Sequence, residues 1–256
     1  MWKTALRIMV CYAALAVPGA DAADMTARQV TRLLFTVPAG STPDLSNKDL
    51  SGLDLSGLDF KKAKLDGVNF YGSDLTHANL SGASLKSARL DRATLIGADL
   101  SGADLSGASL LRPNVFEDMK PSSHSGLSFA GARLVGANLN GRFDGVNFSH
   151  ADLSSAIFGP RDPREEVLIT PMMSLEAANF RGARLVGADL ASNSLENADF
   201  TGADLTHANL RGARLGGANF SDAILDGADL TGAATPDTNL RSARSLKATI
   251  GLATTR

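Results

Sequence analysis

Aspartate and histidine are the residue types in this chain whose spacing could support chemistry. Aspartate recurs at intervals of five and twenty residues, as at Asp54, Asp59 and Asp74, and two neighbouring carboxylates could share a proton as general acid and base. Four histidines could bind a metal ion if they converged in space: His77, His124, His150 and His207. Either activity depends on the elements that position these side chains.

The dominant pattern of the sequence is a period of five residues. Leucine or phenylalanine occupies every fifth position from Leu45 to Leu110 and again from Leu175 to Leu230. A middle block continues the pattern with Phe129, Leu134, Leu139, Phe143, Phe148, Leu153 and Phe158. The period matches neither the 3.6-residue repeat of a helix nor the two-residue alternation of a strand, so it indicates a repeat architecture.

Each five-residue unit has specialised positions, as in Ala98-Asp99-Leu100-Ser101-Gly102. Two-residue alternation directs Leu100 and Ala98 to one side and Asp99 to solvent. Gly102 stands where the chain must bend, because a tight corner requires a residue that tolerates positive φ. One large and one small buried side chain per bend predict a square coil, with about four units in each turn.

This pattern resembles the pentapeptide-repeat family, because Leu or Phe stays in phase over two long blocks with Ala usually two residues before it. The resemblance implies an all-β fold, a right-handed quadrilateral parallel β-helix, which we expect over residues 45–240. With about eight coils at a strand-like spacing of ~4.8 Å, the rod should be roughly 40 Å long. Each buried Leu or Phe should contribute on the order of 1.5–3 kcal/mol through contacts with neighbouring coils.

The repeat gives the aspartates a structural interpretation. Asp54 and Asp74 should lie ~5 Å apart on successive coils. Asparagine alternates with aspartate in the same position, as in Asp59, Asn79 and Asp99, which dilutes like-charge repulsion. The position therefore requires a short polar residue rather than a catalytic pair.

The histidines receive a similar interpretation. His77, His150 and His207 all occupy the corner position two residues after the central Leu or Phe, where a polar side chain faces solvent, and their unequal spacing gives no sign of convergence. No nucleophile elbow, glycine-rich phosphate loop or calcium-loop signature accompanies them. We therefore expect no enzyme activity, no metal, no cofactor and no small-molecule substrate.

The N-terminal segment reads as a signal peptide over residues 1–22. Lys3 and Arg7 precede an apolar run from Ile8 to Val17, and Ala20-Asp21-Ala22 has the small-x-small form of a cleavage site. A membrane anchor is the alternative, but the apolar run is too short to span a bilayer. A lipoprotein would need a cysteine at the cleavage point, and Cys11 lies too early. We expect a periplasmic or secreted protein.

Cleavage would leave a nearly balanced chain without cysteine. Removing residues 1–22 changes the net charge from −2 to −3, and it removes Cys11 and Trp2, which are the only residues of their types. The mature protein would have no disulfide, so its stability in an oxidising compartment must come from the stack of coils.

Both ends of the rod need closure, because an open coil end would template edge-to-edge association. Residues 23–44 should form the N-terminal cap, with a short helix from Asp24 to Phe35 capped by Asp24 or Thr26. Residues 241–256 should form a C-terminal cap or tail. There Leu240, Ala243, Leu246 and Ile250 could build a small helix or an irregular cap. The alternative is a homodimer contact, because relatives pair through C-terminal segments.

Two interruptions, at residues 111–128 and 159–174, break the period and should be loops leaving the rod. The second loop combines charged with apolar side chains, and apolar residues in water favour either packing onto the rod or contact with a partner. Our candidate interaction residues are Arg161, Arg164, Val167, Leu168, Ile169, Met172 and Met173. The alternative is a tolerated surface decoration, because long loops cost little closure entropy.

Two residues break the alanine rule at inward positions. Lys48 belongs to the first units, where the coil can still be open to solvent. Asn193 lies within a regular block, and a buried amide needs hydrogen-bond partners. We expect its side chain to bond backbone groups at a corner.

The sequence favours a non-catalytic exported scaffold that binds an unidentified protein or cell-envelope partner through rod faces or the two loops. The alternative is a nucleic-acid mimic, like relatives that protect DNA gyrase with a strongly negative, duplex-sized surface. Arg89, Arg133, Arg184 and Arg214 occupy the position that would have to be acidic, and an exported protein would not meet gyrase. We expect no nucleic-acid binding. A glycan-binding β-helix would need aromatic platforms, and Tyr71 is the only tyrosine after residue 22.

Overall fold

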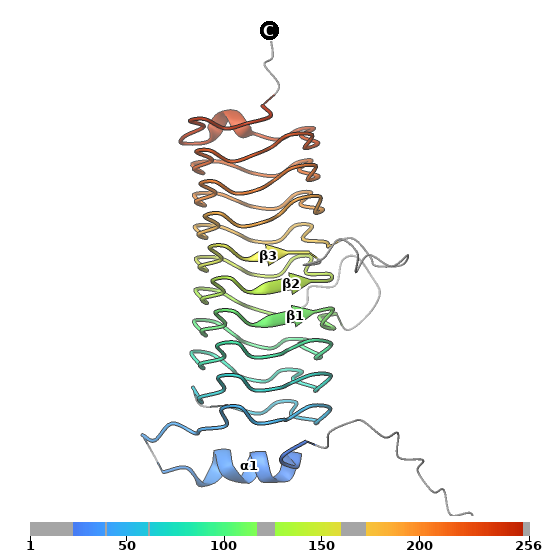
Figure 1. Cartoon of the computed structure of the whole chain (residues 1–256), viewed down its shortest axis with the longest axis vertical. Helices are drawn as coiled ribbons and strands as arrows, with labels where there is room; N and C mark the ends of the chain where they lie inside the picture. Colours follow the sequence, from blue (N-terminus) through green and yellow to red (C-terminus); the bar gives the residue numbers. More distant parts are fainter. Residues whose placement is uncertain (1–22, 39, 61, 117–125, 160–172, 253–256) are drawn as a thin grey trace, which may run out of the picture.

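The computed structural model describes residues 23–38, 40–60, 62–116, 126–159 and 173–252, and the predicted signal peptide lies outside these residues. The chain forms a straight rod of stacked coils with one helix at its N-terminal end (Figure 1).

Parallel backbone pairing between residues twenty apart stacks the coils. Asp54 pairs with Asp74, and Asn209 pairs with Asp229. The N–H of Leu75 donates to the carbonyl oxygen of Thr94 at 2.8 Å, so hydrogen bonds run along the rod axis. Four pentapeptides therefore make one turn, which confirms the predicted coil and places Asp54 beside Asp74.

The three named strands lie next to one another where the period is broken (Figure 1). They are β1 (Ser109–Leu111), β2 (Asn138–Asn140) and β3 (Ile157–Phe158), and they form a parallel sheet in the order β1-β2-β3. Leu110 pairs with Leu139, which is 29 residues on, and Leu139 pairs with Phe158, which is 19 residues on. Compared with the regular interval of twenty residues, the first interval contains an insertion and the second lacks one residue.

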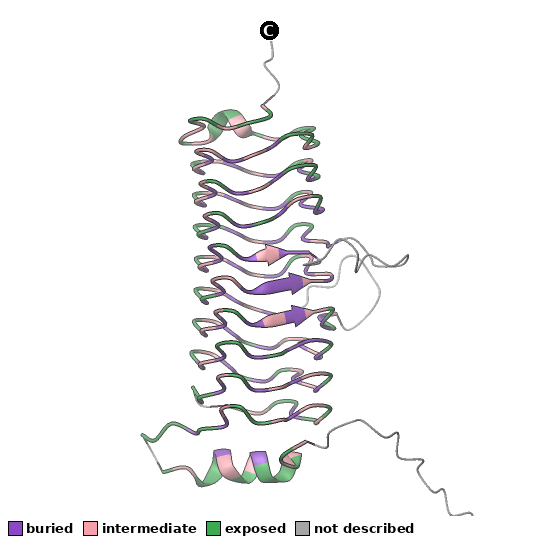
Figure 2. Cartoon of the chain, in the orientation of Figure 1, coloured by how far each residue is buried: buried purple, intermediate pink, exposed green. Residues whose placement is uncertain are grey.

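The core is a column of inward Leu, Phe and Ala side chains that runs the length of the rod. Buried residues alternate with less buried ones along each coil (Figure 2). Phe129, Phe148, Phe180, Phe200 and Phe220 stack with ring centroids 4.9–5.2 Å apart and interplanar angles of 2–7°. Ring spacing therefore follows the strand spacing, so coil stacking and aromatic stacking support each other.

Helix α1 (Ala27–Thr36) lies across the first coil (Figure 1). Thr26, one of the two predicted caps, is its N-cap and forms a capping box with Gln29. The helical residues therefore begin at Ala27 rather than at the predicted Asp24. Val30 and Leu34 are buried in the same cluster as the coil leucines. Asp24 precedes the helix and donates its N–H to the carbonyl oxygen of Asp49 at 2.7 Å, on the edge of the first coil.

The C-terminal end is less regular. A short 3₁₀ helix, η2 (Leu240–Ser242), is followed by two further ladder pairs, Ser245 with Ile224 and Ile250 with Asp229. Leu246 is only half-buried, and Ile250 is 55% exposed. Among the described residues, no helix has the length and apolar character needed to cross a membrane.

Candidate interaction surface

The outward aspartates and asparagines stabilise the corner that follows each of them. Oδ1 of Asp99 accepts the backbone N–H of Ser101 at 2.9 Å, and Oδ1 of Asp54 accepts that of Ser56 at 3.1 Å. Such an Asx turn requires a short side chain with an acceptor, which explains the alternation of Asp with Asn. Hydrogen bonds from Ser56 hold the pKa of Asp54 below its ordinary value, so this carboxylate stays ionised and is a poor general acid.

At several outward serines, a carboxylate from the preceding coil caps the corner. Oδ1 of Asp91 accepts the hydroxyl of Ser109 at 2.6 Å and the backbone N–H of Leu111 at 3.0 Å. The same arrangement joins Asp66 with Ser84, Asp144 with Ser174 and Asp226 with Ser245. Sequence reasoning missed these caps. Their signal is an aspartate 18 residues before an outward serine within an uninterrupted block.

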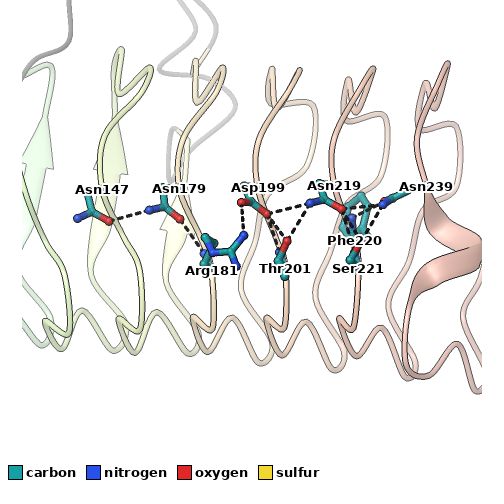
Figure 3. A network of polar contacts seen from close by, with 9 residues as sticks. All are labelled: Asn147, Asn179, Arg181, Asp199, Thr201, Asn219, Phe220, Ser221 and Asn239. Atoms are coloured by element: carbon teal, nitrogen blue, oxygen red, sulfur yellow. Dashed lines mark hydrogen bonds and ion pairs between the residues drawn. The ribbon is translucent and has the colours of Figure 1, made fainter.

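One side of the rod carries a ladder of amides and carboxylates, in which Arg181 bridges Asn179 and Asp199 (Figure 3). The Nδ2 group of Asn179 donates to Oδ1 of Asn147 at 3.2 Å, and Nδ2 of Asn219 donates to Oδ1 of Asp199 at 3.3 Å. Asn239 continues the ladder by donating to Asn219 at 2.6 Å. We call this column the Asx ladder. Its amide and carboxylate groups form hydrogen bonds with one another between successive coils.

Arginines neutralise several of the outward carboxylates. Arg181 pairs with Asp199 at 2.9 Å, and Arg211 pairs with Asp229 at 3.0 Å, each joining one coil to the next. Hydrogen bonds from Thr231 and Arg211 lower the pKa of Asp229 to about 2. These pairs are exposed and contribute little stability singly. They do, however, prevent the described surface from being uniformly negative.

The histidines of the described chain are exposed corner residues with positive φ. His77, His150 and His207 have φ of 55–57°, and each imidazole lies over a glycine of the following coil. A Cβ at Gly97 would overlap the ring of His77. No group of three or more His, Cys, Asp or Glu residues in the described ranges could hold a metal ion. His124 lies outside them.

Most of the candidate loop residues lie outside the described residues: Arg161, Arg164, Val167, Leu168, Ile169 and Met172. Met173 is described, and its inclusion needs correction. Its side chain is 4% exposed and occupies the inward position of the unit that follows the loop. Its Sδ accepts the backbone N–H of Gly141 at 3.3 Å, a donor left over by the one-residue deletion after β2. Met173 therefore belongs to the core and is not available to a partner.

The two inward exceptions have different surroundings. Asn193 is buried, and its Nδ2 donates to the carbonyl oxygen of Phe158 at 3.0 Å, which confirms the expected bond to a backbone group at a corner. Ser73 makes the equivalent bond to Leu50, at 2.7 Å. Lys48 is exposed on the first coil, as expected.

Apolar side chains in outward positions gather on the coils around the two interruptions. They are half-buried and occupy three of the four sides of the rod, leaving the side of the Asx ladder polar. We call this set the mid-rod band: Ile96, Leu111, Phe116, Val135, Ile157 and Val186. Phe116 also packs under the guanidinium of Arg142, 4.3 Å from the ring centroid. The band is the described surface best suited to contact another segment or molecule.

A second apolar surface lies at the C-terminal end. A hollow of about 500 Å³ opens there beside η2. Its apolar lining comes from Leu240, Leu246 and Leu252, with Thr238 and Arg241 among the polar residues around them. The end of the core is therefore only partly covered by the described chain.

Comparison with solved structures finds proteins that are similar over most of their length. HetL, a pentapeptide repeat protein involved in heterocyst differentiation regulation in Nostoc sp. strain PCC 7120, is 25% identical, with 82% of this chain and 93% of that chain covered and a TM-score of 0.39. A trypsin-treated variant of QnrB1, a plasmid-mediated fluoroquinolone resistance protein, is 20% identical, with coverages of 80% and 84% and a TM-score of 0.43. Rfr23 from Cyanothece 51142 is 26% identical, with coverages of 59% and 90% and a TM-score of 0.34.

No curated protein is significantly similar to this chain. The family described as pentapeptide repeats, in contrast, matches it in eight copies, over residues 43–72, 73–110, 125–159, 174–206 and 203–241. These matches cover more than half of the chain and coincide with the stacked coils. The protein therefore belongs to the pentapeptide repeat family.

Proposed function

We propose that this protein is a non-catalytic exported scaffold, which binds a protein or cell-envelope partner through its rod faces or through the loops at 111–128 and 159–174. The observation that carries the proposal is a contrast between two kinds of surface. The polar side chains on the regular coils are largely used in Asx turns, ladders and ion pairs, whereas the mid-rod band presents apolar side chains outward. Pentapeptide repeat proteins are in general structural or binding proteins.

The proposed scaffold is a right-handed quadrilateral β-helix closed at one end by α1. Right-handedness is supported by the strong preference of connections between parallel strands for that hand. The capping role is supported by the burial of Val30 and Leu34 in the core cluster and by the hydrogen bond from Asp24 to the first coil. A rigid rod of this kind can hold two loops at fixed positions.

Export to the periplasm or outside the cell is supported by the three-part pattern of residues 1–22 and by the absence of cysteine from the rest of the sequence. The test is the N-terminal sequence of the protein purified from a periplasmic or culture fraction. We expect it to begin at Ala23. Recovery of the uncleaved chain from the cytoplasm alone would contradict export.

The binding role is tested by affinity capture from envelope extracts, comparing the intact protein with a variant in which residues 160–172 are replaced by one plain repeat unit. Gly159 and Met173 should be kept, because both are buried parts of the rod. The matched control carries Arg181→Ala and Arg211→Ala, which alter ion pairs of the regular coils. Loss of a captured protein in the loop variant alone supports the proposal, and identical captured sets would refute a role for this loop.

The alternative function is a DNA mimic that interacts with a topoisomerase, as in the gyrase-protecting relatives. It would be supported by protection of gyrase from a fluoroquinolone in a supercoiling assay with the purified chain. The pairing of Asp199 and Asp229 with arginines argues against it, because a mimic needs unpaired negative charge. We expect no protection and no binding of nucleic acid.

We propose further that a second copy covers the C-terminal end. Support comes from the hollow beside η2 and from the exposure of Ile250. Light scattering of the purified protein should give the mass of a dimer, and Leu246→Asp should convert it to a monomer. A monomeric wild-type chain at micromolar concentration would refute the homodimer.

A further inference from the structure

The first coil has a backbone edge that the described residues leave unpaired at Asp54. In the second coil, the N–H of Asp74 donates to the carbonyl oxygen of Leu53, and its carbonyl oxygen accepts the N–H of Leu55, both at 2.8 Å. The backbone N–H and C=O of Asp54, one coil earlier, form no hydrogen bond with any described residue. Unpaired N–H and C=O groups on a strand edge are a template for pairing with another extended chain.

The preceding side of the same coil already binds an extended segment. Asp24 donates its N–H to the carbonyl oxygen of Asp49 at 2.7 Å, and its Oδ2 accepts the N–H of Asp49 at 2.9 Å. Helix α1 then lies across the end of the core (Figure 1). None of residues 23–38 bonds to the backbone of Asp54. Strand addition at this edge is therefore used on the side of Asp49 and unused on the side of Asp54.

The inward positions beside Asp54 offer apolar contact area. Leu53 and Leu58 stand where the following coil has Ser73 and Ala78. Both leucines pack against the core cluster but are only half-buried. Helix α1 thus leaves part of the core end open to water on this side, where the inward side chain of an added strand would bury further apolar surface.

The outward positions beside the edge are acidic and lack cations. All four outward residues of the first coil are aspartate: Asp44, Asp49, Asp54 and Asp59. Asp74 pairs with Asp54 on the following coil, at a strand spacing of ~4.8 Å. Neither Asp54 nor Asp74 has an ion pair among the described residues, whereas Asp199 and Asp229 pair with arginines. Like charges directly opposite each other are destabilising, so this pair favours a cation from outside the coil.

A single extended segment fits this edge better than a second copy of the rod. An added strand must lie ~4.8 Å from the edge, whereas a helix is about 10 Å across, so α1 holds the flat end of another coil too far away. Two identical first coils would also bring their aspartates together. A lone strand can lie beside α1, as the backbone at Asp24 does.

We propose that the first coil binds an extended, basic segment of another protein by strand addition along Leu53, Asp54 and Leu55. The segment pairs its backbone with the N–H and C=O of Asp54. It places a lysine or arginine beside Asp54 and Asp74 and an apolar side chain over Leu53 and Leu58. This inference goes beyond the proposed function, because its surface is a coil end rather than a rod face or a loop.

Hydrogen exchange of the unmodified protein gives the first test. Without a bound segment, the amide of Asp54 should exchange at least about tenfold faster than the amide of Asp74, because only the latter is hydrogen-bonded. Equal protection of the two amides would overturn the proposal.

A phage-displayed library of short random peptides, selected against the purified protein, gives the second test. We expect the enriched peptides to alternate lysine or arginine with apolar residues. A synthetic copy of an enriched peptide should slow the exchange of Asp54 at least about tenfold and leave that of Asp74 unchanged. Enriched peptides without basic residues, or peptides that do not slow Asp54, would overturn the proposal.

Two variants separate the backbone from the charge contribution. Asp54→Pro removes the unpaired N–H, and proline is tolerated on strand edges, so it should weaken the selected peptide at least about tenfold. Asp54→Asn with Asp74→Asn keeps the Asx turns and should weaken it about threefold while reducing its salt dependence.

The matched control is Asp99→Asn with Asp189→Asn, which removes the same charge from exposed positions on other coils and should leave peptide affinity unchanged. Wild-type affinity of Asp54→Pro at unchanged thermal melting would overturn the proposal. If that variant melts earlier, the exchange of Asp54 in the unmodified protein decides. None of these readouts involves residues 160–172, so a negative result is distinguishable from failure of the loop-binding function.

Discussion

Replacing Asn193 with alanine should destabilise the rod through one hydrogen bond. Asn193 is 3% exposed, and its Nδ2 donates to the carbonyl oxygen of Phe158 at 3.0 Å. That carbonyl ends β3, and no other group of the described residues donates to it. Alanine fits the site, because Ala93 and Ala213 occupy the same inward column of other coils. The main effect of the change is therefore an unsatisfied carbonyl.

An unsatisfied buried acceptor costs about 1–3 kcal/mol. For a chain of this size each kcal/mol lowers the melting temperature by roughly 2–4 °C. The free energy of unfolding should be measured in urea, with the slope against denaturant checked to be unchanged, so that the midpoint reports stability alone. Calorimetry of the same variants gives the change in melting temperature.

The matched variant is Asn193→Ser. Ser73 makes the equivalent bond, from its hydroxyl to the carbonyl oxygen of Leu50 at 2.7 Å, so serine should retain most of the stability that alanine loses. Equal stability of wild type and Asn193→Ala would refute the reasoning. Equal losses for alanine and serine would show that the amide stabilises by its volume rather than by its bond.

Three further predictions concern the corners, the carboxylates and the core. Gly97→Ala should be more destabilising than Gly102→Ala in urea unfolding, because both residues have positive φ but only the added Cβ at 97 would overlap His77. In a His77→Ala background the two glycine substitutions should cost the same, and equal losses in the presence of His77 would contradict the overlap. Stability should fall as pH drops from about 4 towards 2, because Asp229 has a folded pKa of about 2, below its ordinary value of 3.8, and its stabilisation is lost on protonation. Asp229→Asn should make the urea midpoint less dependent on pH in this range. An identical pH profile of the variant and the wild type would refute the assignment. Leu100→Asp should cost about 4 kcal/mol or more, because it buries an unpaired charge at a fully buried position; unchanged melting would refute the inward assignment.

The regular part of the fold could be predicted because its cause is local. Each unit repeats the same alternation and bend, so the phase of Leu100 or Leu205 already determines which side chains are buried. The helix near residue 30 followed from an apolar face behind a capping residue. The bond of Asn193 followed from the general requirement that a buried amide be satisfied, although the identity of Phe158 as its partner did not.

The errors and omissions lie where the period is broken. Met173 was placed in the interaction loop, because the sequence does not state at which residue an insertion returns to the coil. The caps formed by Asp91 and Asp226 were missed, because they join residues that become neighbours only when one coil lies on the next. The same holds for the histidine rings over glycines.

The sequence by itself determined the coil, its four sides and the inward or outward direction of each regular position, because these depend on dihedral preferences and hydrophobic burial within a few residues. Only the tertiary structure decided which residues meet across coils after an insertion of variable length or a one-residue deletion. Register there is set by the residue that re-enters the stack, and this choice leaves Asn138 without its local donor and brings Asn193 to Phe158.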